Sequence, residues 1–452
     1  MGSSSDEKTV SNQVIEPALS ISNGVVADET PDQEVFKITS NGVNFRTVTW
    51  PRMIIILLKV QVATGVLGIP AALGSTGAVP GALLIVTCQV LNTYLVDIGE
   101  EIWGAAGREV VGLIFLVAQV IVTGSGILGT SIALNALSNH GACSVWFSFV
   151  ATVMVILFSC IRTWDRMTWP LTFGFCSVFG GVLAVVIGVT LNDRPAAAPQ
   201  TGPFDLGFHV VAHPSFAAGV TSALTIFISS SAGPIYVPIV AEMKRPQDYR
   251  KAVVPVGVLI GAIYLSFSMV VYYYCGTWIA TPSLGSAGPL VKKVAYGIAL
   301  PSLIISAGLF NHAVAKYTFV RFLRNSPHFQ QNTWQHWSSW IGMNVGLGFL
   351  AFIVAEAIPV FNYILALAAS VCLAPECLII PAFAWTHEFG KEYRAGTMKQ
   401  KAIFAFHWLL ILIGVFLVVG GTYGTAESIK ESYSAEAVFS CADNSNTIIS
   451  SS

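Results

Sequence analysis

The stretch from Met53 to Val79 reads MIIILLKVQVATGVLGIPAALGSTGAV and holds one charged side chain, that of Lys59. An apolar run of this length can cross the hydrocarbon core of a bilayer, where a helix satisfies its own backbone polar groups. The run nevertheless has Gly65, Gly68 and Pro70 near its midpoint, and these residue types weaken or end a helix. The sequence therefore predicts a membrane-spanning helix that is interrupted at mid-depth.

Ten further apolar runs follow this one, which predicts an all-α polytopic membrane protein with eleven transmembrane helices. Composition agrees with this class, because only 10% of the residues are charged, against about 25% in soluble domains. The expected spans are residues 50–76, 80–103, 110–138, 144–161, 167–191, 214–241, 252–279, 290–320, 338–356, 358–386 and 402–426.

Three regions are expected along the chain. Residues 1–46 are Ser-rich, acidic and poor in aromatic side chains, which is typical of a disordered tail, and they have no apolar segment of the kind that marks a cleavable signal peptide. Residues 47–426 form the transmembrane domain, and residues 427–452 form a second tail.

Most of the 23 lysines and arginines fall in the segments that share a side with the N-terminus. Since basic residues concentrate on the cytoplasmic side, we expect a cytoplasmic N-terminus and, after eleven crossings, an outer C-terminal tail. The plasma membrane is the expected location, and the vacuolar membrane is the alternative.

A second interrupted run reads ISSSAGPIYVP, from Ile228 to Pro238, in the middle of the sixth span. The two interrupted spans are five crossings apart, and because five is odd a second five-helix unit starts from the opposite face. This predicts an inverted repeat of residues 50–191 and 214–386, with 402–426 as an extra helix. Paired interrupted spans are the best sequence pointer to the substrate site of a secondary transporter, although glycine and proline in a single span more often mark helix packing.

The chemistry of the two interruptions favours a zwitterion. The half-helix that begins at Pro70 would direct its free N–H groups to mid-membrane, where they suit a carboxylate. Freed carbonyl groups at Ser229–Gly233 would suit an ammonium group. Neither interruption contains a charged side chain, which favours a substrate without net charge. Candidates for the side-chain pocket are Phe227, Tyr236, Val120, Thr123 and Ser125, each with plain helix packing as its alternative.

Charged or titratable groups inside the spans are candidates for ion coupling. These are Lys59, His312, Lys316 and Glu376, and for the two lysines the alternative is that the amine extends to the membrane surface. Glu376 is too deep to reach the surface, so we expect it to be neutral or paired, with Lys59 or Lys316 as partners and a structural pair as the alternative to a proton carrier. Glu242, beside Lys244 and Arg245, is expected at the membrane interface.

The eight cysteines are expected mostly as small packing residues. Cys372 and Cys377 do not have a metal-ligand spacing, and no catalytic motif is present, so we expect no metal, no cofactor and no enzyme activity. Cys143 and Cys275, both near the outer face, are candidates for a disulfide. Nothing indicates nucleic acid as a partner.

The segments LLKVQVATGVLGIPAALGSTG, SSSAGPIYVPIVAEMKRPQDYRKAV and LAPECLIIPA resemble the amino acid/auxin permease family in its fungal, neutral or aromatic amino acid permease branch, and the resemblance covers about residues 46–426. It implies the leucine-transporter fold, with a five-plus-five inverted repeat and broken helices 1 and 6, and transport of amino acids, usually with protons. The substrate-binding residues that it implies are Thr64, Gly65, Val66, Leu67 and Gly68 in span one, and Phe227, Ser229, Ser230, Ser231, Ala232 and Gly233 at span six.

The fold that is implied has a second ion site between spans one and eight, near Ala63, Val66, Asn311 and Lys316. A lysine there would repel sodium, which favours proton coupling. The sequence thus predicts a secondary active transporter of neutral aliphatic or aromatic amino acids that uses proton symport and alternating access in a lipid bilayer. The alternative is an amino-acid sensor on a transporter scaffold without net flux.

Overall fold

The computed structural model describes residues 45–63, 65–95, 104–324, 326–329, 331–358, 360–432 and 438–445. The predicted tail, up to residue 44, and the candidate substrate residue Thr64 lie outside these ranges.

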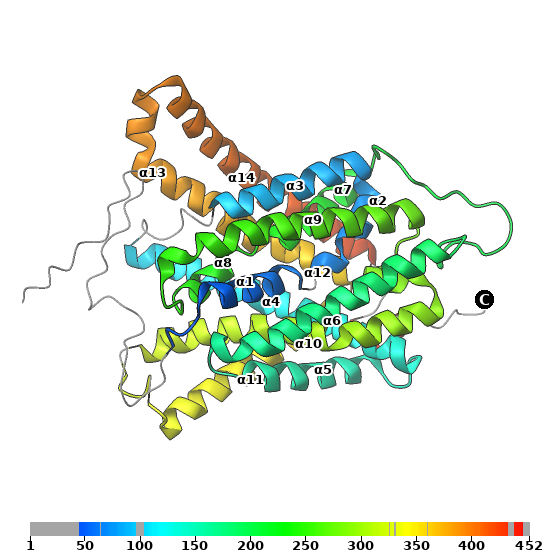
Figure 1. Cartoon of the computed structure of the whole chain (residues 1–452), viewed down its shortest axis with the longest axis horizontal. Helices are drawn as coiled ribbons and strands as arrows, with labels where there is room; N and C mark the ends of the chain where they lie inside the picture. The colour runs from blue at the N-terminus through cyan, green and yellow to red at the C-terminus, as the bar shows by residue number, and fades with distance from the viewer. Residues whose placement is uncertain are drawn as a thin grey trace, which may run out of the picture.

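The described residues are nearly all helical (Figure 1), and extended pairing within them is limited to one bridge between Val48 and Met243. The α-helices are α1 (Trp50–Gln61), α2 (Ile69–Thr76), α3 (Ala78–Leu95), α4 (Gly104–Ser138), α5 (Ser144–Ser159), α6 (Trp164–Leu191), α7 (Phe216–Ser230), α8 (Gly233–Val240), α9 (Arg250–Cys275), α10 (Pro289–Leu323), α11 (Trp334–Ala357), α12 (Phe361–Ala368), α13 (Ile380–Ala395) and α14 (Met398–Ser432). Short 3₁₀ segments are η1 (Gly65–Leu67), η3 (Pro246–Asp248) and η4 (Ser283–Ala287), and π-helical turns η5 (Ala369–Leu373) and η6 (Pro375–Ile379) join α12 to α13.

The prediction of an all-α polytopic membrane protein is confirmed. Within the described ranges eight helices are long and apolar enough to span a membrane, or nine if the bent pair α1 and α2 is one span. The helices Ala78–Asn92 and Ser144–Ser159, which match two further expected spans, are apolar but shorter. The count of eleven crossings therefore remains a prediction.

The first span is interrupted as predicted. Helix α1 ends at Gln61, η1 follows, and α2 begins at Ile69 with Pro70 in its first turn. Proline suits this place because its missing N–H would have no helical partner there. The two halves are bent by 41° relative to each other.

The sixth span is also interrupted, since α7 ends at Ser230 and α8 begins at Gly233, again with a proline in the first turn. The chain between the two helices is only Ser231 and Ala232. The broken helices are thus the first and sixth of the predicted spans, as the five-plus-five repeat requires.

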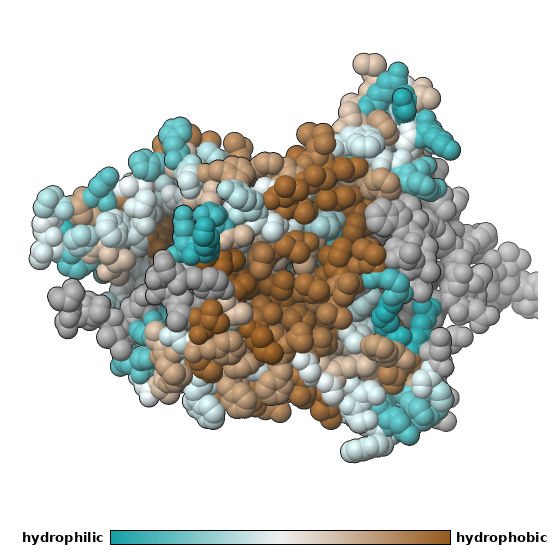
Figure 2. Space-filling model, turned by 180° about the vertical axis from the view of Figure 1, so that it is seen from behind, coloured by the Kyte–Doolittle hydropathy of each residue, from teal (hydrophilic) through white to brown (hydrophobic). Residues whose placement is uncertain are grey.

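The bundle is organised around α10, which packs against α4, α6, α5 and α11. Helix α14 packs against α7 and α13, and α13 and α14 form a hairpin that projects from the bundle in Figure 1. Figure 2 shows a broad apolar surface across the middle of one face, with hydrophilic residues toward both ends, as a bilayer requires.

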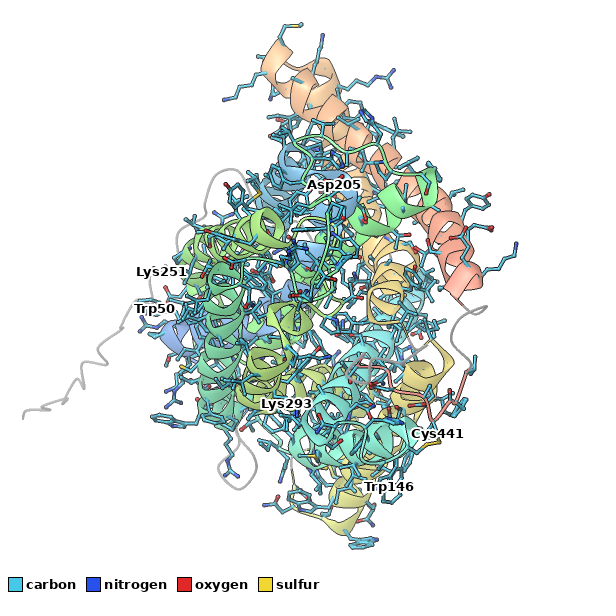
Figure 3. The ribbon with its side chains drawn as sticks, turned by 90° about the vertical axis from the view of Figure 1, so that its right-hand side faces the viewer. Trp50, Trp146, Asp205, Lys251, Lys293 and Cys441 are labelled. Carbon is cyan, nitrogen blue, oxygen red and sulfur yellow. A yellow bond between two sulfur atoms is a disulfide. The ribbon has the colours of Figure 1, made fainter. Side chains whose placement is uncertain are left out.

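The predicted pairing of Cys143 with Cys275 is wrong. Cys143 forms a disulfide with Cys441, and Cys275 is a buried free thiol at the end of α9. Figure 3 shows Cys441 on the side of the bundle where Trp146 of α5 lies. The chain around Cys441 is held further by hydrogen bonds: Asn135 Nδ2 donates to Asn444 Oδ1 at 2.7 Å, and Lys292 donates to the Ser445 carbonyl. A partner almost 300 residues away in the sequence gives no local signal.

Candidate substrate site between two broken helices

The two interruptions contact each other directly. A methyl group on Gly65 would lie 2.7 Å from Ser229 Oγ and 3.0 Å from Ser229 Cα, which is closer than van der Waals contact allows. A methyl group on Gly68 would lie 2.8 Å from Thr225 Cγ2 and 2.9 Å from Asn362 Oδ1. At Gly65 the added methyl group would meet the backbone of α7, which favours glycine there, whereas at Gly68 it would meet the ends of two side chains, from α7 and α12, which would have to shift.

A tyrosine that the sequence reasoning did not single out joins the two interruptions. Tyr264 of α9 is fully buried, and its hydroxyl group lies 2.5 Å from the Gln61 carbonyl oxygen and 3.0 Å from the Ser229 carbonyl oxygen. The Gln61 side chain in turn donates to the Tyr236 hydroxyl at 2.7 Å. Carbonyl groups freed by a helix break need such partners away from water. A tyrosine inside an apolar span was the available signal, since its hydroxyl usually finds a partner when buried.

A cavity of about 50 Å³ lies where the interruptions meet. Its lining residues are Val60, Gln61, Ala63, Gly65, Gln119, Val122, Ile228, Ser229, Ser231, Ala232, Pro234, Ile235, Phe310, Leu365 and Leu373. The predicted substrate residues Gly65, Ser229, Ser231 and Ala232 thus lie together on its wall.

Other predicted substrate residues are near this cavity without lining it: Val66, Leu67, Gly68, Phe227, Ser230 and Gly233. Phe227 packs in an apolar cluster that includes Leu373 and Leu410. The candidates for the side-chain pocket on α4, Val120, Thr123 and Ser125, do not line it either, because α4 turns Gln119 and Val122 toward the cavity. Tyr236 of α8 is also absent from the wall, and its hydroxyl group accepts from the Gln61 side chain.

The cavity is lined by the backbone of the first interruption and by hydroxyl groups of the second. Gly65 lines one side, three residues before Gly68, which is the N-cap of α2, and helix N-termini favour anions. On the other side Ser229 Oγ donates to the Thr225 carbonyl at 2.8 Å and Ser231 Oγ to the Phe227 carbonyl at 2.7 Å. Both hydroxyl groups have used their proton, so their oxygen lone pairs can accept from an ammonium group.

Lys59 is completely buried and surrounded by oxygen atoms. Its Nζ donates to Ser302 Oγ at 2.7 Å and to Ser306 Oγ at 2.5 Å, and lies 3.4 Å from the carbonyl oxygens of Val62 and Ser302. The serines belong to α10, so this amine connects the inner half of the first span to α10. No carboxylate is among these partners.

Lys316 lies elsewhere and forms a buried ion pair with Glu242. Lys316 also donates to the Arg162 carbonyl at 3.1 Å, and Glu242 Oε2 accepts from the Trp164 amide at 3.3 Å. Glu242 is 0% exposed, so it is not the solvated group expected beside Lys244 and Arg245, because Lys316 of α10 pairs with it inside the bundle. One of the two expected partners of Glu376, Lys316, is therefore paired with Glu242.

His312 and Glu376 have contrasting surroundings. His312 is buried with Nδ1 at 3.2 Å from the Ser159 carbonyl and its ring edge-on to Trp164 and Trp340, which is a packing role. Glu376 lies in η6, 8% exposed, and neither carboxyl oxygen has a hydrogen-bond partner in the described part of the chain. The expected pairing of Glu376 with Lys59 or Lys316 is not formed.

The neighbourhood predicted for a second ion site is only partly assembled. Asn311 donates to Ser159 Oγ at 2.9 Å and to the Asn344 carbonyl at 3.2 Å, on the side of α5 and α11. The cationic group between the first span and α10 is that of Lys59, not Lys316. Among the described residues, no three His, Cys, Asp or Glu side chains are grouped to hold a metal ion.

Two solved structures follow a partly similar course of the chain. The nucleobase-cation-symport-1 family transporter Mhp1, in a closed conformation with bromovinylhydantoin bound, has a TM-score of 0.49 and 13% identity, over 91% of this chain and all of that one. MhsT in complex with L-phenylalanine has a TM-score of 0.48 and 13% identity, over 84% of this chain and 98% of that one.

Three sequence relatives match this chain over most of its length. A protein of Gibberella moniliformis (strain M3125 / FGSC 7600) named "Transmembrane transporter" is 46% identical over 466 residues, which is 99% of this chain and 97% of that protein. A protein of the same name from Fusarium pseudograminearum (strain CS3096) is 47% identical over 92% of this chain and 91% of its own. The "N amino acid transport system protein" of Neurospora crassa is 26% identical over 93% of this chain and 92% of its own.

The family model described as "Transmembrane amino acid transporter protein" matches residues 92–427. This range runs from α3 to α14 and includes the second interruption, Lys316 and Glu376. The matched range exceeds half of the chain, and the chain therefore belongs to the transmembrane amino acid transporter family.

Proposed function

We propose that this secondary transporter carries neutral amino acids by proton symport and alternating access. The observation that supports a neutral substrate is the cavity between the two interruptions, whose described lining residues include no charged side chain. A cationic or anionic substrate side chain would need a buried counter-charge there. The name of the Neurospora relative supports an amino acid as the substrate.

In this proposal the substrate lies across both interruptions. Its carboxylate binds the backbone N–H groups of the segment Thr64–Gly68, at the N-terminal end of α2. Its ammonium group binds oxygens of the segment Ser229–Gly233, with Ser229 and Ser231 offering hydroxyl lone pairs on the cavity wall. Its side chain points to the apolar wall, which suits aliphatic and aromatic amino acids.

Proton coupling is assigned to Lys59. Its amine is held by the hydroxyl groups of Ser302 and Ser306, and while it is protonated its charge disfavours a sodium ion among the same oxygens. Loss of the proton would weaken the connection between the first span and α10, which would link protonation to movement of the inner half-helix. Glu376, a buried carboxyl group without a partner in the described chain, is the second candidate for carrying the proton.

The membrane arrangement is part of the proposal: eleven crossings, residues 1–46 and 427–452 as tails, a cytoplasmic N-terminus and the plasma membrane as location. The disulfide between Cys143 and Cys441 supports this orientation. It joins the loop after α4 to the C-terminal tail, both expected outside, and disulfides persist in oxidising compartments rather than in the cytosol.

The test is uptake of radiolabelled neutral amino acids by permease-deficient cells that express the chain at the surface, with and without a protonophore. The proposal expects uptake that rises as the outside becomes more acidic and that the protonophore abolishes. Absence of uptake for the whole neutral set would refute it, and binding without flux in proteoliposomes would favour a sensor.

A further inference from the structure

One polar side chain on the cavity wall makes no evident structural contribution. Gln119 of α4 is 3% exposed and lines the cavity, and its Oε1 has no hydrogen-bond partner in the described part of the chain. A buried polar group without a partner destabilises a fold, because the group has lost its hydrogen bonds to water. A leucine or methionine would fill the same space without that loss, so packing alone does not account for a glutamine here.

The other buried polar side chains on this part of α4 are satisfied by their own helix. Thr123 Oγ1 donates to the Gln119 carbonyl at 2.7 Å, Ser125 Oγ to the Val122 carbonyl at 2.7 Å, and Thr130 Oγ1 to the Gly126 carbonyl at 2.8 Å. Gln119 differs from these residues because it lines the cavity. The apolar side chains of Val122 and Phe310 line the same cavity.

The position of Gln119 assigns it to the substrate's side chain. If the two interruptions hold the carboxylate and ammonium groups, α4 faces what remains of the substrate. An amide offers one acceptor oxygen and an N–H donor group. It can pair by two hydrogen bonds with another primary amide, and by one with a hydroxyl group, whereas an aliphatic side chain leaves it unsatisfied.

We propose that Gln119 is a specificity-determining residue, which makes this transporter prefer neutral amino acids whose side chains end in a hydrogen-bonding group, glutamine and asparagine first. This rests on the proposed function for neutral amino acids as a class, and it departs from the aliphatic and aromatic preference because such side chains would leave Gln119 unsatisfied. A site built to bond a polar group rejects the analogue that lacks the group far better than an apolar pocket rejects an added one. The preference is therefore set by the unsatisfied amide rather than by cavity size.

The experiment compares glutamine with methionine, which has nearly the same length and no amide. The full chain is purified and reconstituted into proteoliposomes, and kcat/KM for each labelled amino acid is measured for wild type, for Gln119→Met and for Thr130→Val. Thr130 is a matched control because it is a buried polar residue of the same helix that bonds only within α4.

Wild type is expected to favour glutamine over methionine by roughly 10- to 100-fold, the range of one lost hydrogen bond with an unsatisfied partner. In Gln119→Met the preference should disappear while methionine uptake stays or rises, and Thr130→Val should keep the wild-type ratio.

Either of two results would overturn the inference and leave the proposed function standing. One is equal transport of glutamine and methionine by wild type, and the other is an unchanged ratio of glutamine to methionine kcat/KM in Gln119→Met. If Gln119→Met fails to fold, the wild-type ratio alone decides. If wild type transports no neutral amino acid, the proposed function itself fails.

Discussion

The buried ion pair between Glu242 and Lys316 gives a sharp prediction about what stabilises the packing of α10 against the end of α8. The two side chains are 0% and 5% exposed, so neither charge can be hydrated if its partner is removed. Glu242 also lies at a junction, because Val48 N donates to the Glu242 carbonyl at 3.0 Å and Lys244 N donates to the Val48 carbonyl at 2.8 Å. The pair thus connects α10 to the end of α8 and to the segment before α1.

Replacement of one partner should be strongly destabilising. In Glu242→Gln the ammonium group of Lys316 stays buried beside the Arg162 carbonyl without its carboxylate, and loss of one member of a buried pair costs about 3–5 kcal/mol. At 1.4 kcal/mol per tenfold change, this lowers the equilibrium constant for folding by roughly 100- to 4,000-fold. Removal of both charges leaves no unpaired ion, so the double variant Glu242→Gln, Lys316→Met should lose much less than the sum of the single variants.

The assay is a double-mutant cycle on the midpoint of thermal denaturation of the purified protein in detergent, with uptake measured in parallel. Single variants are expected to melt several degrees below wild type, and the double variant is expected to recover most of the difference. Single variants that melt like wild type, or a double variant whose loss equals the sum of the two, would refute the reasoning.

Three further predictions concern other buried groups. Lys59→Met should abolish the pH dependence of uptake and proton-driven accumulation while exchange of substrate across the membrane persists, and an unaltered pH profile would remove Lys59 from coupling. Glu376→Gln should leave thermal stability equal or higher, because both carboxyl oxygens lack hydrogen bonds in the described chain; a flattened pH profile in this variant would transfer the coupling role to Glu376. Cys441→Ser and Cys143→Ser should each lower the free energy of unfolding by about 2–4 kcal/mol, and the double variant should lose no more than either single variant. The effect of Cys275→Ser on stability should be the same with and without the disulfide. Additive losses for Cys143 and Cys441 would contradict the linkage.

The sequence predicts the broken helices well because their cause is local. Pro70 and Pro234 lie in the first turns of α2 and α8, since a proline suits the first turn of a helix and disrupts its interior. The sequence predicts that the two interruptions lie near each other, but not which residues are in contact. That Gly65 lies against Ser229 depends on how closely α7 approaches, which no local pattern encodes.

The partners of buried charges and thiols cannot be predicted from the sequence, because these contacts are not local. Glu242 looks interfacial beside two basic residues, but its partner Lys316 comes from a helix two spans later. Cys143 likewise pairs with Cys441 in a tail that carries little sequence signal. Such pairs form only where the packed bundle brings distant segments together.

Which residues of α4 line the cavity depends on the rotation of this helix about its axis. The sequence favours Val120, Thr123 and Ser125 of α4 as residues of the side-chain pocket, while the α4 residues on the cavity wall are Gln119 and Val122. Neighbouring residues on a helix are separated by a rotation of about 100°, so the lining face is decided by how α4 packs against α10. An apolar span offers little periodicity from which to read this.

The central claim is that the contact between the two interruptions is the substrate site, and Gly65→Ala tests it most directly. The added methyl group would lie 2.7 Å from Ser229 Oγ, a misfit of the kind that costs about 1–3 kcal/mol. The measurement is initial uptake of a labelled neutral amino acid into proteoliposomes, with Gly74→Ala as a control on α2, where the nearest atom would be 3.6 Å away. The account predicts at least a tenfold loss in Gly65→Ala and none in Gly74→Ala, and wild-type uptake by a stably folded Gly65→Ala protein would contradict it.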